Sequence, residues 1–118
     1  MVDLFRQSLT HVWRALYRWS ITEGLRRLDL DREDPAETPP DAGECNCSIC
    51  RRIGGLWHHC TPDKVTVEGE GASYQQGDCA LDLWHCPTCG CVTHWTPTDP
   101  TYPRMGVNLR MFEPELWR

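Results

Sequence analysis

The sequence of 118 residues lacks any apolar run near the roughly 18 residues of a membrane span, so we expect no integral membrane insertion. It also lacks an N-terminal secretory signal, because no long apolar stretch leads to a small-residue cleavage site. An excess of positive charge is missing too: the net charge is −5, which argues against a nucleic-acid partner. No repeat of fixed period is present.

Cysteine is absent from the first 44 residues, yet eight cysteines lie between Cys45 and Cys91. An even number allows a disulfide framework, which is typical of small secreted proteins. The missing secretory signal and the close spacing of these cysteines instead favour metal binding in a reducing compartment. We therefore predict a metal-binding protein of the cytoplasm.

The length fits one domain, or one domain with an arm. Apolar residues make up 40% of the chain and charged residues 25%, which is typical of a folded globular protein. Residues 1–28 hold five arginines against two acids, whereas residues 29–44 are strongly acidic and contain three prolines. We predict a helical arm over 1–28, an acidic linker or loop over 29–44, and a zinc-binding domain over 45–118.

Apolar residues recur at helical spacing over residues 4–19, including Phe5, Leu9, Val12 and Leu16. This spacing predicts an amphipathic helix, with arginines largely outside its apolar stripe. We favour a helix that packs on its own domain or on a second copy; the alternative is a basic helix that contacts a membrane or a partner. Over the leucines that follow, the pattern does not decide between helix and strand.

A glycine pair at residues 54–55 marks a turn, and beyond it apolar and polar residues alternate. The alternation is clear at residues 65–67, 81–85 and 105–111. Short alternating segments separated by turn residues are typical of antiparallel strands. The sequence therefore predicts a mainly β fold of short antiparallel strands.

Three thiols lie within six residues in the motif Cys45-Asn46-Cys47-Ser48-Ile49-Cys50. Such a trio can hold one zinc ion from one side and leave a fourth position open, as catalytic sites do. A further cysteine or histidine would instead close the site into a structural one. The spacing alone does not choose between these alternatives.

A second motif, Cys86-Pro87-Thr88-Cys89-Gly90, has the form of half a structural zinc site. A redox dithiol is the other interpretation of the same residues. Cys60 and Cys79 belong to no motif, and we expect them to be small buried hydrophobes. We expect structural roles for four histidines and for the six tryptophans. The histidines are His58, His59, His85 and His94, and the tryptophans include Trp57, Trp84 and Trp95.

Four polar residues are candidates for substrate contacts. Arg51 and Arg52 adjoin the cysteine trio, and a guanidinium pairs well with a carboxylate. Asn108 and Arg110 alternate with apolar residues, so we expect them to share one face of a strand. For all four, a solvated surface role is the alternative.

The ordered set of motifs resembles the glutathione-dependent formaldehyde-activating enzyme family, whose domain is shared with centromere protein V. The resemblance covers roughly residues 24–114 and is strongest over 43–112. The motifs that carry it are Cys45 to Arg52, Gly55-Leu56-Trp57, Cys86 to Gly90, and Gly106 to Arg110.

The resemblance implies a small β-tent fold with zinc. It implies that Cys45, Cys47 and Cys50 hold a catalytic zinc with an open position. It also implies that Cys86 and Cys89 hold a second, structural zinc together with an N-terminal Cys-x-Cys-Gly.

This chain departs from the family pattern at the N-terminal half of that second site. If Gly24 matches the family's glycine, the two cysteine positions here are Ile21 and Glu23. Neither side chain replaces a thiolate well. One or two zinc ions per chain are therefore expected.

The resemblance implies a carbon–sulfur lyase similar to S-hydroxymethylglutathione synthase. Glutathione or another small thiol, bound to zinc as thiolate, would add to formaldehyde or a related aldehyde. The alternatives are a non-catalytic, zinc-stabilised binding module that docks through the helix of residues 4–19, and a decayed family member.

Overall fold

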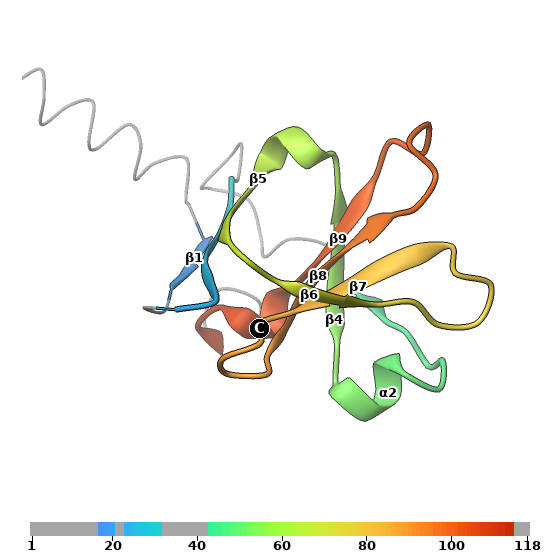
Figure 1. The fold of residues 1–118 in the computed structure, drawn as a ribbon, viewed down its shortest axis with the longest axis horizontal. Coiled ribbons are helices and arrows are strands. Elements are labelled where there is room, and N and C mark those ends of the chain that lie inside the picture. The colour runs from blue at the N-terminus through green and yellow to red at the C-terminus, as the bar shows by residue number, and fades with distance from the viewer. Residues whose placement is uncertain (1–16, 21–22, 32–42, 115–118) are drawn as a thin grey trace, which may run out of the picture.

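The computed structural model describes residues 17–20, 23–31 and 43–114 and shows a mainly β protein, which confirms the predicted fold class (Figure 1). The strands are β1 (Tyr17–Ser20), β2 (Leu25–Leu30), β3 (Gly43–Glu44), β4 (Leu56–Cys60), β5 (Val65–Gly69), β6 (Ala72–Tyr74), β7 (Leu81–His85), β8 (Val92–Pro97) and β9 (Met105–Asn108). The described helical segments are α2 (Cys50–Ile53) and the 3-10 turns η1 (Pro62–Lys64) and η2 (Leu109–Met111).

The strands form two antiparallel sheets. The larger sheet has six strands in the order β3-β4-β9-β8-β7-β6, and the smaller has three in the order β1-β2-β5. The chain passes from β2 of the small sheet to β3 and β4 of the large sheet, returns to the small sheet at β5, and re-enters the large sheet at its β6 edge. Within the described part of the chain, no helix is long and apolar enough to cross a membrane.

The strands predicted from alternation at residues 65–67 and 81–85 are confirmed as β5 and β7. The third predicted strand is shorter than expected, because β9 ends at Asn108 and the chain turns into η2. The Asn108 side chain accepts a hydrogen bond from the backbone N–H of Arg110, which starts this turn. The prediction that Asn108 and Arg110 share one face of a strand is therefore wrong, because Arg110 lies in η2.

The N-terminal segments need a correction. Residues 17–20, predicted as the end of a helix, form strand β1 and pair with β2, while residues 4–16 lie outside the described residues. Strand β2 crosses the boundary predicted at residue 28, and β3 lies inside the predicted linker. Pairing with β5 and β1 makes β2 part of the domain, an arrangement that local periodicity could not show.

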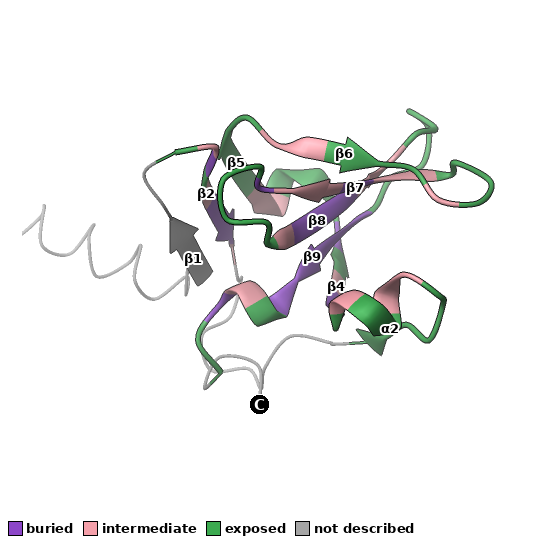
Figure 2. Ribbon diagram, turned by 60° about the horizontal axis from the view of Figure 1, so that its bottom comes forward, coloured by how far each residue is buried: buried purple, intermediate pink, exposed green. Residues whose placement is uncertain are grey.

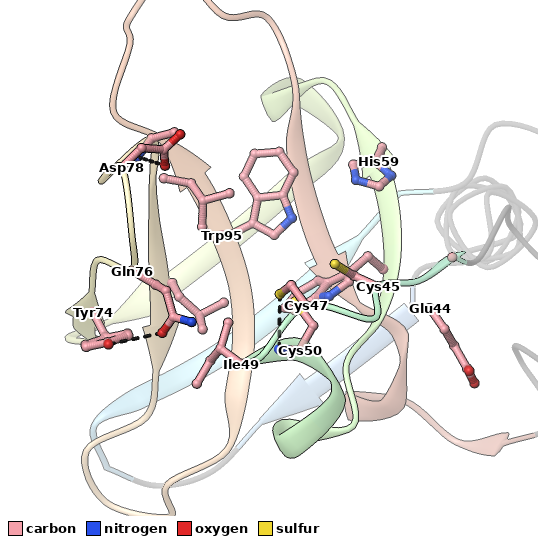
Figure 3. Close-up of a pocket in the computed structure, with 15 residues that line it drawn as sticks. Glu44, Cys45, Cys47, Ile49, Cys50, His59, Tyr74, Gln76, Asp78 and Trp95 are labelled. Carbon is pink, nitrogen blue, oxygen red and sulfur yellow. Dashed lines mark hydrogen bonds between the residues drawn. The ribbon is translucent and has the colours of Figure 1, made fainter.

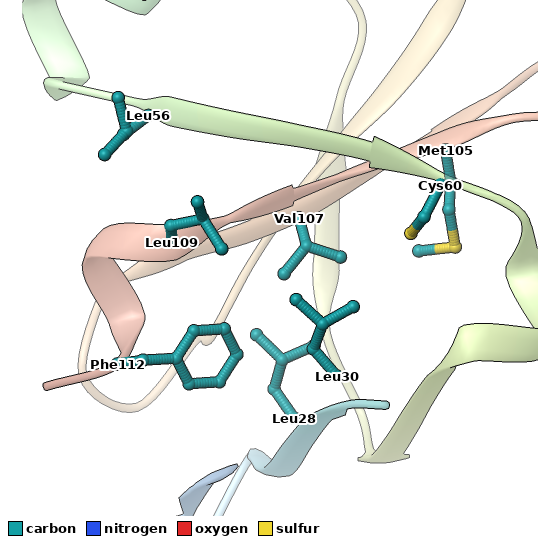
Figure 4. Close-up of a cluster of buried hydrophobic side chains, with 8 residues drawn as sticks. All are labelled: Leu28, Leu30, Leu56, Cys60, Met105, Val107, Leu109 and Phe112. Atoms are coloured by element: carbon teal, nitrogen blue, oxygen red, sulfur yellow. The ribbon is translucent and has the colours of Figure 1, made fainter. Parts of the chain in front are cut away.

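One hydrophobic core lies between the two sheets. Figure 4 shows Leu28 and Leu30 of β2 facing Val107 of β9 and Phe112 beyond η2. The cluster as a whole consists of Leu28, Leu30, Leu56, Cys60, Met105, Val107, Leu109 and Phe112. The expected burial of Cys60 is confirmed, since only 8% of it is exposed.

A second cluster covers the other face of the large sheet. Successive residues of β4 point to opposite faces, so Leu56 joins the first core and Trp57 the second. Trp57 packs there with Leu83 and Trp95, and Cys50 of α2 packs against them. In Figure 2 the buried residues follow β8 and β9, whereas α2 and the β6 edge are half-buried or exposed.

His94 of β8 is a buried histidine, as expected for a structural role. Its ring stacks on Trp84 with the ring centres 5.9 Å apart, and its Nδ1 lies 2.8 Å from the hydroxyl of Thr93. Burial lowers the pKa of His94 to about 4, because a charged imidazolium loses its hydration there.

We predict that the free energy of unfolding falls by up to about 3 kcal/mol between pH 6.5 and pH 4, through His94 alone. The pKa of His94 is lower in the folded chain than in the unfolded chain. Between these two pKa values the unfolded chain binds a proton at His94 and the folded chain does not, so lowering the pH favours unfolding. Urea unfolding at several pH values measures this. The His94→Gln variant should lose this component, and an unchanged pH slope would contradict the prediction.

Candidate metal centre

Cys45 and Cys47 lie in the loop between β3 and α2, and Cys50 is the first residue of α2. The sulfur atoms of Cys45, Cys47 and Cys50 all lie within 4.8 Å of one another. In a tetrahedral site with zinc–sulfur bonds of about 2.3 Å, the sulfurs would be about 3.8 Å apart. The three thiols are therefore close enough to hold a metal ion after a small closure.

Backbone hydrogen bonds fold this loop. The N–H of Arg51 donates to the carbonyl of Cys47, and the N–H of Cys50 points at the Cys47 sulfur at 3.4 Å. Gly54 ends α2 in the left-handed conformation, with φ 66°, and the chain then enters β4. The turn expected at the glycine pair is thus what returns the chain from the cysteine loop to the sheet.

The pKa values of the Cys47 and Cys50 thiols are shifted in opposite directions. The backbone N–H and the thiol of Cys50 donate to Cys47 and lower its pKa to about 7. Burial raises the pKa of Cys50 to about 12, and the neighbouring thiols of Cys47 and Cys45 add to the rise. One thiolate is therefore favoured at neutral pH, and a cation is needed before all three ionise together.

The indole N–H of Trp57 is a buried donor beside this cluster. Trp57 is 3% exposed, and its Nε1 has no hydrogen-bond partner among the residues that the structure describes. The indole nevertheless faces the Cys50 sulfur closely enough to oppose the rise in that pKa. A metal-bound Cys50 thiolate would be a stronger acceptor for this N–H. This unpartnered buried donor is an observation that fits a thiolate site.

The trio opens onto a cavity of about 440 Å³, and Figure 3 shows the sulfurs of Cys45 and Cys47 on the side that faces His59 and Trp95. Its floor is apolar and consists of Ile49, Trp57, Leu81, Leu83 and Trp95. Its polar rim consists of Glu44, His59, Tyr74, Gln76 and Asp78. Cys45 and Cys47 are exposed and Cys50 is half-buried.

A second, polar depression of about 290 Å³ adjoins Cys45 and Cys50. Arg51 and Arg110 both line it, so the structure brings together two of the predicted substrate contacts. Arg110 also pairs with Glu44, with 3.3 Å between Nη2 and Oε1.

The other two predicted contacts have local roles. Arg52 donates to the backbone carbonyl of Ser48. Asn108 is 5% exposed and lines neither depression. Its side chain accepts from the backbone N–H of Leu56 at 3.2 Å and donates to the carbonyl of Val92 at 2.8 Å, so it joins three segments of backbone.

Cys86 and Cys89 form the predicted knuckle, and in the described part of the chain no third candidate ligand joins them in a group whose atoms all lie within 4.8 Å of one another. The N–H of Gly90 donates to the carbonyl of Cys86 at 2.8 Å, and Gly90 has a positive φ of 80°. Burial raises the pKa of Cys86, but N–H groups of Cys89, Leu25 and Thr88 outweigh it and lower the pKa to about 7. Among the described residues, only the Cys45 trio brings three candidate ligands together.

The expected match of Gly24 to the family's second site has a structural counterpart. A Cβ on Gly24 would lie 2.7 Å from the Thr88 hydroxyl and 3.0 Å from the Cys86 sulfur, so the segment packs on the knuckle. The Cys86 thiol lies 3.9 Å from the carbonyl of Glu23. Position 23 thus adjoins the knuckle but carries a glutamate, and Ile21 lies outside the described residues. The described residues do not support a second zinc.

Several residues of the cavity rim were not predicted from the sequence. Tyr74, Gln76 and Asp78 precede β7 and come to line the cavity only through the folding of the sheet, and Gln76 contacts Ser48 of the cysteine loop. His59 was expected to be structural, but it is exposed in the cavity wall, with its ring 5.7 Å from that of Trp95. Cys79 is exposed and has φ 59°, so its expected burial is wrong.

Fold and site together define a mainly β protein with a three-cysteine candidate metal centre beside an apolar cavity. No family model matches the sequence, and no curated protein matches it. The chain is similar to the crystal structure of a Rhodobacter sphaeroides protein, a Northeast Structural Genomics target. The two are 26% identical with a TM-score of 0.63, over 82% of this chain and 88% of that chain. This likeness bears on the fold.

We predict one zinc per chain, lost in the Cys47→Ser variant and retained in Cys89→Ser. If the roughly 10–16 kcal/mol of zinc binding is shared among four ligands, losing one thiolate weakens binding by about 100-fold or more. Elemental analysis with parallel thiol titration measures this. Two zinc ions per chain, or zinc retained by Cys47→Ser, would contradict the assignment.

The Trp57→Phe variant should keep the fold but bind zinc about 10–100-fold more weakly, because Cys50 loses its neighbouring donor. Competition with a chromophoric chelator measures the affinity. The thiolate absorption band of the cobalt-substituted protein should also shift. Trp95→Phe is the matched control, since Trp95 lines the same cavity but its indole lies over Gly106. Equal zinc affinity of the Trp57 variant and the unaltered chain would contradict this role.

Proposed function

We propose that the protein catalyses the reversible addition of a thiol to an aldehyde at a zinc ion held by Cys45, Cys47 and Cys50. This is carbon–sulfur lyase chemistry of the kind implied by the resemblance to the glutathione-dependent formaldehyde-activating family. The observation that carries the proposal is the open cluster: three close thiols line a cavity. Among the described residues, no fourth cysteine, histidine or carboxylate joins them.

Three thiolates and an exchangeable fourth position suit thiol chemistry better than hydrolysis. The thiolates neutralise the charge of the ion and make it a weak Lewis acid, which disfavours activation of water. When bound, zinc would supply an incoming thiol in its deprotonated form at neutral pH. The cysteines of the loop hold and orient the centre, and the apolar floor limits the access of water to it.

The reaction forms one bond between the thiol sulfur and the carbonyl carbon. The carbonyl π electrons move to the oxygen, which takes up a proton equivalent to the one that the thiol releases. His59 lies in the cavity wall and carries an imidazole that can deliver this proton. In the reverse direction the carbon–sulfur bond breaks and the same proton is returned. The proposed setting is a reducing compartment such as the cytoplasm, where thiols remain available.

The test is the exchange rate between free and thiol-bound aldehyde, because thiols also add to formaldehyde without an enzyme. Two-dimensional exchange NMR with glutathione and labelled formaldehyde, or with other thiol and aldehyde pairs, should show acceleration of at least roughly tenfold by zinc-loaded protein. Cys47→Ser should abolish the acceleration and Cys89→Ser should keep it. Zinc-loaded protein that accelerates no pair would contradict the proposal and favour a non-catalytic zinc-stabilised module.

A further inference from the structure

We infer that the cavity beside the cysteine trio binds an apolar, uncharged group of the substrate, of about ten to fifteen non-hydrogen atoms. This inference rests on the proposed function for the identity of the reacting groups. The apolar group is the substituent attached to the sulfur of the thiol or to the carbonyl carbon of the aldehyde, and we place it in the cavity.

The volume of the cavity is the first argument. A water molecule takes up about 30 Å³ in the liquid, so about 440 Å³ corresponds to roughly fifteen non-hydrogen atoms. Formaldehyde has two such atoms and would leave most of the apolar floor in contact with water. Cavities of this size are typical of sites for larger small molecules.

The chemistry of the floor is the second argument. Two indoles, from Trp57 and Trp95, lie beside the aliphatic side chains of Leu81 and Leu83. Trp95 can lie flat on the sheet because its cross-strand partner is Gly106, where a Cβ would come within 2.0 Å of the indole nitrogen. Such a surface gains free energy when an aromatic or aliphatic group covers it.

The charges are the third argument. Among the described residues, the acids that line the cavity are Glu44 and Asp78, and no arginine or lysine lines it. Glu44 also lines the other depression, where it pairs with Arg110, so Asp78 is the acid that belongs to the cavity alone. Glutathione carries two carboxylates, which these acids would repel. The arginines Arg51 and Arg110 line the other depression, on a different side of Cys45. An anionic part of a substrate is therefore directed to that depression and an uncharged part to the cavity.

The cavity wall is joined to the cysteine loop by side-chain hydrogen bonds. The amide of Gln76 donates to the hydroxyl of Ser48 at 2.5 Å, and Tyr74 donates to Gln76 at 3.1 Å. Ser48 lies between two of the three cysteines, so the segment before β7 is held against the metal centre. An apolar group in the cavity would thus lie next to the sulfur cluster (Figure 3).

The first test uses the full chain and needs neither metal nor activity. In NMR titrations, 3-phenylpropan-1-ol should shift the indole N–H signals of Trp57 and Trp95, whereas the anionic S-methylglutathione should not. Leu81→Gln should weaken phenylpropanol binding about tenfold, because Leu81 is a half-buried part of the floor. The matched control is Tyr102→Gln, at an exposed residue outside the cavity, which should bind as the unaltered chain does. Shifts that are larger with S-methylglutathione, or absent with both probes, would overturn the inference.

The second test asks which reactant carries the apolar group. With zinc-loaded protein, exchange is compared for 3-phenylpropanal against formaldehyde, and for phenylmethanethiol against glutathione. A preference of at least about tenfold for either apolar reactant, reduced by Leu81→Gln, supports the inference and names the reactant. Preference for formaldehyde and glutathione together would overturn it. If no pair is accelerated while phenylpropanol still binds, the proposed function fails and the apolar site stands.

Discussion

The large sheet carries an apolar cluster on each face, and strand β4 contributes side chains to both clusters. The position of the site depends on this division. Leu56 and Cys60 of β4 enter the core shared with the small sheet, while Trp57 enters the cluster beneath the cysteine loop. The small sheet therefore does more than shield apolar surface. By covering one face, it leaves the opposite face for α2 and the cysteines, and it holds β4 so that Trp57 reaches Cys50.

The cysteine loop is built locally and places three thiols where they could hold a metal ion. Its short turns bring three sulfurs together, and the N–H of Cys50 favours a thiolate at Cys47. Burial raises the pKa of Cys50, and its hydrogen bonding with the thiols of Cys47 and Cys45 adds to the rise. The same crowding that raises the pKa of a bare thiol makes the trio an effective ligand set for a divalent metal.

The surroundings of the trio are asymmetric in charge and polarity. One side is a cavity with an apolar floor and the carboxylate of Asp78, and the other is a depression with two arginines; Glu44 lies between them and pairs with Arg110. Asn108 helps to position the residues around the trio through its backbone hydrogen bonds. Its side chain joins the start of β4 to the carbonyl of Val92 and to the backbone N–H of Arg110. A buried amide with three backbone partners is costly to replace, which explains its position without a substrate contact.

The local features of this protein could be predicted from its sequence. Alternation predicted β5 and β7, and the Cys-x-Cys-x-x-Cys spacing predicted three thiols close together, because neighbours in the chain are neighbours in space. The strand Tyr17–Ser20 could not be predicted in this way, since it forms through its pairing with β2. Likewise, strand pairing brings Gln76 to the cysteine loop and Asp78 to the cavity, and it places Asn108 among its backbone partners. The periodicity of apolar residues predicts the strand or helix in which a residue lies. The residues that line a site depend in addition on which strands pair with one another.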